Sequence, residues 1–420
     1  MRIVILICSI FGLLTACGGG GSSSQSANNP VPTSVPGTTP TPVPTPVPTP
    51  VPVLSPMAQL GEKIFNDHNL SGSGRMSCAT CHDPAFFHGP PNSLPVQVGG
   101  TFETQFGVRA APSLRYLERN PAFSLGQGHA AELRGGLMID GRVNTLAQQA
   151  RLPLFNSIEM DNLDVADLAR KLRRSVYADF FAQVFGNSDA DTTVNQMQQA
   201  LQAFQLEDSR FHPYDSKYDQ FLAGRLSLSA AEQRGLQVFN DPARGNCNAC
   251  HTSTSTDGKP PLFTNFSYAA LGLPRNSAIP KNADPAYFDL GVCGPNRNDL
   301  SDPQYCGLFR TPSLRNVAKR GSFFHNGVIH SLSQAVQFYN TRDTRPELWY
   351  PQAGGQVQKF DDLPLRYQTN LSRQMPLDGR APGSRAPMTE QEVSDLVCFL
   401  QTLSDDYHVG IVPPDAACGN

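Results

Sequence analysis

The chain has 420 residues, which is enough for two domains with hydrophobic cores of their own. Its formal net charge at pH 7 is −3, so it lacks the strong positive charge typical of proteins that bind nucleic acids or anionic lipids, and we expect no nucleic-acid partner. Only 16% of residues are charged, whereas there are 35 glycines and 36 prolines, which indicates a loop-rich fold.

The first residues resemble an export signal. Arg2 precedes an apolar run from Ile3 to Leu14, which is too short to span a bilayer. Residues 14–17, Leu-Thr-Ala-Cys, resemble the lipobox of bacterial lipoproteins. The resemblance implies removal of residues 1–16 and acylation of Cys17; an ordinary cleaved signal with a free Cys17 is the alternative. We therefore expect a lipoprotein of the bacterial cell envelope, anchored to a membrane with its body on the periplasmic side, and we favour the outer membrane.

Residues 17–56 form a tether in this interpretation. A Gly/Ser-rich stretch comes first, and Pro30 to Pro56 then contains 11 prolines. Such a sequence cannot build a core and favours extended polyproline II, which would reach on the order of 80 Å at about 3.1 Å per residue. A stalk of this kind would hold the rest of the chain away from the membrane.

The chain contains the motif Cys-x-x-Cys-His twice. The residues are Cys78, Cys81 and His82 in the first copy and Cys247, Cys250 and His251 in the second. Two cysteines at this spacing can reach the two vinyl groups of one porphyrin, and the histidine can then ligate the iron. A zinc site or a redox-active cysteine pair is the alternative, but zinc would need two cysteine pairs close together. We expect two covalently bound c-type haems.

Other elements also occur twice, and three helix starts carry capping signals. The repeated elements are Gly61–Asp67 and Gly235–Asp241, Arg109–Arg115 and Arg310–Arg315, and Asp140–Arg142 and His325–Gly327. The capping signals are Ser55-Pro56, Ser229 with Glu232, and Thr389 with Glu392, and amphipathic helices are expected at Val194–Leu206 and Val393–Leu403. Strand signals are weak. The sequence predicts a mainly α fold with two cytochrome c-like haem domains, 57–222 and 223–412, packed face to face, and a tail at 413–420.

Four cysteines outside the two motifs remain, and an even number suggests disulfides in an oxidising compartment. Proximity in sequence favours Cys293–Cys306 and Cys398–Cys418, although spacing alone leaves the connectivity open. Cys398 is equally compatible with a buried thiol on the last helix.

These residues, in this order, resemble the bacterial di-haem cytochrome c peroxidase family, in its MauG-like branch. The resemblance covers about residues 57–405 and includes both Pro-Ser-Leu-Arg turns, the Asp-Gly-Arg element and Phe323–Gly327. It implies that the N-terminal haem reduces hydrogen peroxide to water and that the C-terminal haem takes electrons from a small cytochrome c or cupredoxin. His82 and His251 match the proximal iron ligands.

The resemblance also implies roles on the distal side of the first haem. The position of the distal histidine of classical members is Phe102, which cannot ligate iron, so we expect an open or water-bound site unless His88 or His129 swings in. Glu159 matches the distal glutamate of the family and Gln149 the amide beside it. A carboxylate in an apolar haem pocket is suited to moving a proton between the two oxygens of peroxide. An ordinary solvated glutamate is the alternative for Glu159.

The distal ligand of the second haem is methionine in classical members, and the matching position here is Tyr339. A phenolate would lower the redox potential relative to methionine. Met375 and Met388 remain rivals by ordinary cytochrome chemistry, and Tyr339 could simply be an aromatic residue on a helix face.

Two positions depart from the family pattern. The tryptophan that often precedes Asp-Gly-Arg is replaced by Ile139, and the single tryptophan of the chain is Trp349. The asparagine that binds an interdomain calcium ion is replaced by Ala110, so Ca²⁺ is possible only through backbone carbonyls. We expect a di-haem peroxidase; the alternatives are a MauG-like oxidase that modifies a side chain of a partner protein and a di-haem electron carrier without its own substrate.

Overall fold

The computed structural model describes residues 53–408 and residue 418. The expected signal, the acylated Cys17, most of the tether and most of the tail lie outside these residues. The described residues belong to one compact unit. Within 53–408 no helix is both long and apolar enough to cross a bilayer.

The first half of this unit is built from six helices. They are α1 (Pro56–Phe65), α2 (Cys78–Cys81), α3 (Leu146–Phe155), α4 (Val165–Arg173), α5 (Ala178–Phe185) and α6 (Ala190–Glu207). The Ser55 side chain caps α1 by accepting from the Ala58 N–H, as the Ser-Pro start predicts. Helix α1 packs on α6 where Gly61 faces the Ala200 carbonyl, and a Cβ at position 61 would lie 2.0 Å from that oxygen. Only glycine permits this close approach.

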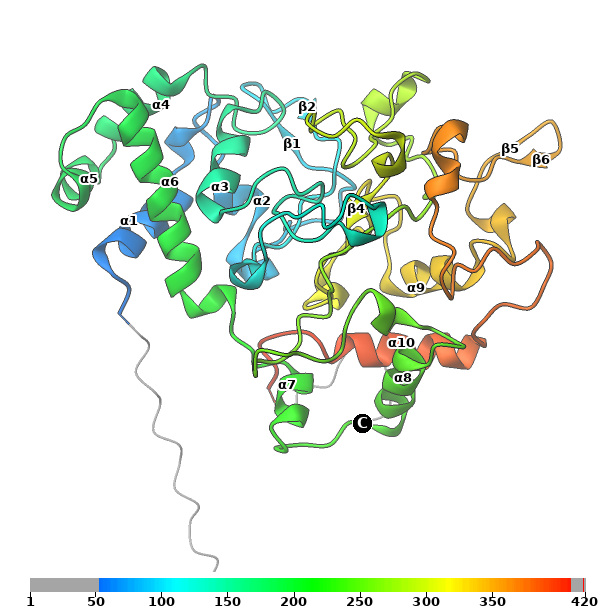
Figure 1. The fold of residues 1–420 in the computed structure, drawn as a ribbon. Coiled ribbons are helices and arrows are strands. Elements are labelled where there is room, and N and C mark those ends of the chain that lie inside the picture. The colour runs from blue at the N-terminus through cyan, green and yellow to red at the C-terminus, as the bar shows by residue number, and fades with distance from the viewer. Residues whose placement is uncertain (1–52, 409–417, 419–420) are drawn as a thin grey trace, which may run out of the picture. The chain divides into compact units, whose positions relative to one another are not determined.

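The second half repeats this helix pair. Its helices are α7 (Lys217–Leu222), α8 (Ala230–Asn240), α9 (Leu332–Thr341) and α10 (Glu390–Gln401). Helix α7 falls within the predicted first domain, 57–222, but its Tyr218 packs in the core of the second half. The predicted capping boxes at the starts of α8 and α10 are both formed. Helix α8 packs on α10 where Gly235 faces the Asp395 carbonyl, and a Cβ at position 235 would again lie 2.0 Å from the oxygen. Figure 1 shows α1 against α6 and α8 beside α10.

The strands are short, as the weak strand signals predict. Three antiparallel pairs of two residues each occur in the described chain: β1 (Val98–Gly99) with β2 (Gln105–Phe106), β3 (Tyr268–Ala269) with β4 (Phe309–Arg310), and β5 (Gln352–Ala353) with β6 (Gln356–Val357). The remaining regular segments are 3₁₀ turns: 68–70, 84–86, 117–119, 130–132, 209–211, 247–249, 280–283, 303–305, 317–319, 346–348 and 365–370. The fold is therefore mainly α.

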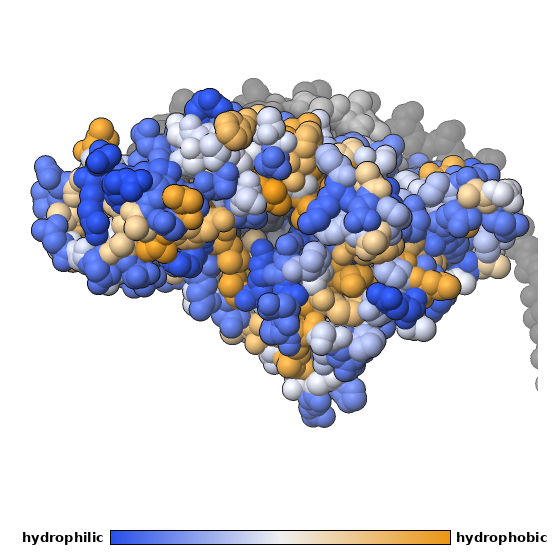
Figure 2. Space-filling model, turned by 90° about the horizontal axis from the view of Figure 1, so that it is seen from above, coloured by the Kyte–Doolittle hydropathy of each residue, from blue (hydrophilic) through white to orange (hydrophobic). Residues whose placement is uncertain are grey.

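Each helix pair carries its own hydrophobic core. Leu60, Phe65 and Phe204 belong to the cluster of the first half, and Phe239 and Phe399 belong to that of the second. On the face shown in Figure 2, hydrophobic residues are scattered in small groups among hydrophilic ones. The apolar mass of each half thus lies inside, around its helix pair.

Both expected disulfides are present. Cys293 is bonded to Cys306, and Cys398 on α10 is bonded to Cys418. The alternative of a free buried thiol at Cys398 is therefore wrong. The cysteines of the two Cys-x-x-Cys-His motifs are free, as haem attachment requires.

Candidate haem-binding active site

Both Cys-x-x-Cys-His motifs border one cavity of about 560 Å³. All four motif cysteines and both motif histidines line it, and its lining is mostly apolar. Helix α2 carries the first cysteine pair, and the 3₁₀ turn at 247–249 begins the second. Among the described residues, no three His, Cys, Asp or Glu side chains gather in a metal-binding group, so the zinc alternative finds no ligand set here.

Each motif histidine is oriented by a backbone carbonyl. His82 Nδ1 lies 3.0 Å from the Pro112 carbonyl oxygen, and His251 Nδ1 lies 2.9 Å from that of Phe263. A carbonyl can only accept, so Nδ1 is the protonated nitrogen and Nε2 keeps its lone pair for a metal. Burial lowers the pKa of both imidazoles to about 4, which keeps them neutral. The two sites therefore fit c-type haems in thiol supply and in the state of the axial histidine.

The Pro-Ser-Leu-Arg turns lie beside both histidines: Pro112 of the first turn bonds His82, and the second turn bonds the residue before Phe263. Ser113 donates to the Phe87 carbonyl and Ser313 to the Leu262 carbonyl. The arginine that ends each turn is buried and ion-paired, Arg115 with Asp405 and Arg315 with Asp219. The repeat seen in the sequence thus marks the support of each proximal ligand.

Glu159 and Gln149 both line the cavity with the first motif. Asn156 Nδ2 donates to Glu159 Oε2 at 2.7 Å. Burial raises the pKa of the Glu159 carboxyl, while the hydrogen bond from Asn156 and the charge of Arg142 oppose the rise. Gln149 comes from α3, whose last turn leads into the segment that carries Glu159.

Glu159 is distinguished from the other acidic side chains of the cavity by its lack of a cation partner. Asp289 pairs with Arg109 at 2.6 Å, and Asp362 lies 3.6 Å from Arg275. Among the described residues, no lysine, arginine or histidine nitrogen lies within 4.0 Å of the Glu159 carboxylate. Glu159 is therefore the lining carboxylate best able to gain and lose a proton.

The backbone around Glu159 is held by the β1–β2 hairpin. The Gly100 N–H donates to the Glu159 carbonyl at 2.8 Å. A Cβ on Gly99 would lie 2.7 Å from the same oxygen and 2.6 Å from the Ile158 carbonyl. The glycine at position 99 thus lets the hairpin approach the segment that carries Glu159 closely.

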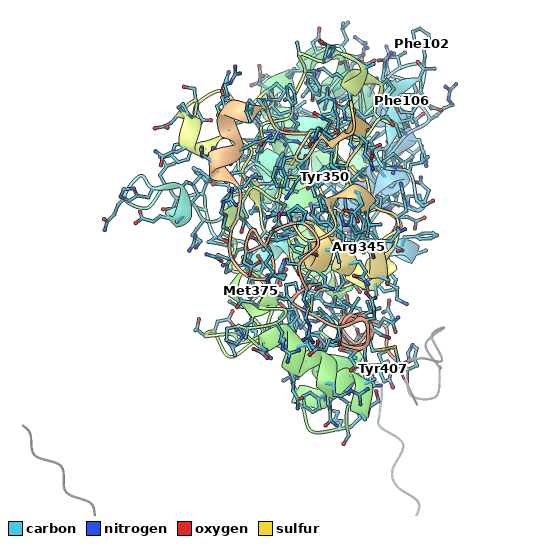
Figure 3. All side chains as sticks on the ribbon, turned by 90° about the vertical axis from the view of Figure 1, so that its right-hand side faces the viewer. Phe102, Phe106, Arg345, Tyr350, Met375 and Tyr407 are labelled. Atoms are coloured by element: carbon cyan, nitrogen blue, oxygen red, sulfur yellow. A yellow bond between two sulfur atoms is a disulfide. The ribbon has the colours of Figure 1, made fainter. Side chains whose placement is uncertain are left out.

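Phe102 lies at the tip of this hairpin and points away from the cavity. Its side chain is 80% exposed, and it lies at the edge of the molecule in Figure 3. His88 is fully buried and stacks on Phe211 at 4.0 Å between ring centroids, whereas His129 is exposed. Neither histidine lines the cavity. None of these three side chains therefore stands where it could ligate the first iron in this conformation.

Tyr339, Met375 and Met388 all line the cavity together with the second motif. Burial raises the pKa of Tyr339, so its phenol stays protonated unless a cation approaches it. The Met375 sulfur lies 3.8 Å from an Arg380 nitrogen, and Met388 belongs to the hydrophobic core of the second half. The structure brings both expected ligand types to the second haem site.

The two halves meet at or beside elements that occur twice in the sequence. The Ala110 N–H donates to the His325 carbonyl, and the Arg310 N–H donates to the Ile139 carbonyl. Ile139 lines the cavity, whereas Trp349 lies outside it and donates from Nε1 to Thr341. Ala110 offers no side-chain oxygen, so Ca²⁺ binding through backbone carbonyls stays a prediction.

Sequence reasoning missed the centre of this contact. Asp405 accepts from Arg115, which ends the first Pro-Ser-Leu-Arg turn, and from Tyr116 and Asn316, which directly follow the first and second turns. The arginine that ends each turn was the sequence signal available for the residues that donate to Asp405. Asp405 carries no motif and comes from far along the chain.

Comparisons with known proteins agree with this geometry. The family model for di-haem cytochrome c peroxidase matches residues 55–227. MauG of Paracoccus denitrificans is 35% identical over 368 residues, covering 83% of this chain and 88% of that protein. The cytochrome c551 peroxidase of Pseudomonas aeruginosa is 29% identical, covering 66% of this chain and 70% of that protein.

A solved structure gives the same result. The di-haem peroxidase BthA of Burkholderia thailandensis superposes with a TM-score of 0.78 at 40% sequence identity, covering 87% of this chain and 90% of that chain. The family implies two c-type haems, and the thiols and histidines described above supply a site for each. The chain belongs to the di-haem cytochrome c peroxidase family, which includes the MauG proteins.

Proposed function

We propose that this protein reduces hydrogen peroxide to water with electrons from a small periplasmic redox protein. The observation that carries the proposal is the Glu159 carboxylate, which lines the cavity beside the first haem motif without a cation partner and with a raised pKa. Similarity to the peroxidases named above supports the same activity. The reaction consumes two electrons and two protons for each peroxide and yields two waters.

The residues divide the work as follows. When bound, the haem held by His82 supplies an iron centre that binds peroxide and exchanges electrons. Glu159 would accept a proton from the peroxide oxygen nearer the iron and deliver it to the other oxygen, which leaves as water when the O–O bond breaks. The Gln149 amide donates a hydrogen bond to the bound oxygens, and the apolar lining excludes bulk water. Electrons would arrive through the second haem, which His251 and Tyr339 would hold.

A second function, MauG-like oxidation of a side chain on a partner protein, is favoured by Tyr339. This residue, rather than a methionine, occupies the position predicted for the distal ligand and lines the cavity. A phenolate favours the oxidised metal, which suits a protein that stores oxidising power until a partner docks. We further propose that acylated Cys17 anchors the protein to a membrane on the periplasmic side.

Steady-state kinetics separate the two functions. The purified holoprotein is mixed with peroxide and a reduced small cytochrome, and cytochrome oxidation is followed by absorbance. Oxidation of two cytochromes per peroxide at many turnovers supports the peroxidase. Turnover no faster than that of a haem-containing Glu159→Gln variant would refute it, and persistent oxidation of added tyrosine- or tryptophan-containing proteins would then support the second function.

A further inference from the structure

Six arginines line the cavity, and they differ in whether a carboxylate pairs with them. They are Arg109, Arg115, Arg142, Arg310, Arg315 and Arg320. Four of them form ion pairs with buried aspartates within 4.0 Å: Arg109 and Arg142 with Asp140, Arg115 with Asp405, and Arg315 with Asp219. Arg310 and Arg320 have no such partner among the described residues.

Arg320 is the less compensated of these two. Arg310 has Asp140 near enough to act on its charge. Arg320 donates only to neutral groups, the Ser322 carbonyl at 3.2 Å and the Ala111 carbonyl at 3.1 Å. Burial lowers the pKa of the Arg320 guanidinium to about 10, with no anion to oppose the effect. Arg320 is half-buried, and a charge that is partly removed from water in this way is costly unless an anion joins it.

The position of Arg320 is fixed against the first half of the chain. Its partner Ala111 precedes Pro112, whose carbonyl orients His82, and its charge acts on His82. The next residue, Gly321, packs so closely that a Cβ there would lie 2.8 Å from the Ser93 Cα. The guanidinium therefore borders the part of the cavity that belongs to the first haem motif.

We propose that Arg320, supplied by the second half of the chain, binds a propionate carboxylate of the first haem. The haem brings its own carboxylates into a cavity that otherwise leaves this cation unpaired, and arginine binds carboxylates through charge-assisted hydrogen bonds. The inference rests on the haem content that the family implies and not on the peroxidase activity. A small inorganic anion is the other source of the same negative charge.

The test uses three haem-containing variants: Arg320→Gln, Arg320→Lys and, as a control, Arg345→Gln. Arg345 is an exposed arginine whose nearest carboxylate is Glu347, and it is labelled in Figure 3. Resonance Raman spectra report the propionate bending band, and spectroelectrochemistry reports the midpoint potential of each haem. Neither readout requires peroxide turnover, so failure of this inference and failure of the proposed function are separate results.

We expect Arg320→Gln to shift the bending band and to lower the potential of the first haem, because a positive charge that favours the reduced state is lost. We expect Arg320→Lys to leave the midpoint potential of the first haem close to that of the wild type. Arg345→Gln should change neither the bending band nor the potential. If Arg320→Gln fails to fold, deuterium exchange of the wild-type protein replaces it, and the band must then shift. An unchanged band in whichever of these two measurements is made, or a first-haem potential that follows chloride or phosphate concentration, would overturn the proposal.

Discussion

Replacement of Glu159 by glutamine tests the proton transfer directly. Glutamine has nearly the same volume, and its carbonyl oxygen can still accept the hydrogen bond from Asn156, which is 2.7 Å long in the wild type. Only the ability to take up a proton is removed. A positioned acid–base group contributes about 10²–10⁴-fold, so we expect peroxide turnover to fall by that factor, or about 3–5 kcal/mol in barrier height.

The pH profile sharpens this prediction. The shuttle must begin as a carboxylate, so activity is present above the pKa of Glu159 in the folded protein and is lost as the pH falls through it. Burial raises that pKa, which moves the acidic limb above the ordinary glutamate value of about 4.3. The variant should retain a low rate and lose this limb.

Stopped-flow or steady-state rates of donor oxidation between pH 4 and 8 provide the assay, with haem content measured by the reduced absorbance spectrum. Glu103→Gln is the matched control. Glu103 lies on the β1–β2 hairpin, pairs with Arg75 and does not line the cavity. A Glu159→Gln rate within about threefold of wild type, far below the expected 10²-fold loss, would refute the assigned role.

Three further predictions concern the surroundings of the two sites. Tyr339→Phe should create a high-spin signal from the second haem in EPR spectra of the oxidised protein, whereas Met375→Leu should not; the reverse pattern would make Met375 the ligand. Gly99→Ala should push on the Ile158 and Glu159 carbonyls, 2.6 and 2.7 Å from the new Cβ, and lower peroxide turnover by about 10²-fold at unchanged haem content. Serine at both Cys398 and Cys418 removes a cross-link that spans 20 residues and should cost about 3 kcal/mol of unfolding free energy in chemical denaturation, whereas an unchanged midpoint would show that the cross-link does not limit stability.

Local signals in the sequence predicted much of the fold. The capping residues Ser229 and Thr389 mark helix starts because a side-chain oxygen must satisfy N–H groups only three residues away. The near disulfide pairings are correct because a short loop costs little entropy to close. These features depend on neighbours in the chain, and the sequence displays such neighbours directly.

Features that depend on distant residues could not be predicted. Phe102, which matches the distal histidine of classical members, has an exposed side chain, and this orientation could not be predicted from the sequence. Asp405 meets Arg115 across 290 positions of sequence. That Arg320 has no anionic partner could be recognised only once the ion pairs of the other cavity arginines were known. Tyr339 and Met375, the rival candidates for the distal ligand of the second haem, both line the cavity, and the choice of Tyr339 stays a prediction.

The carbonyl partners of the two motif histidines have a consequence for how the halves can differ. A peptide oxygen does not titrate, and no side-chain substitution removes it. His82 and His251 make this bond at nearly equal length, 3.0 and 2.9 Å, so both would offer Nε2 to a metal in the same tautomer. If the two centres have different roles, we expect the difference to come from residues other than these two histidines, such as Glu159 and Tyr339, which side-chain mutation can change.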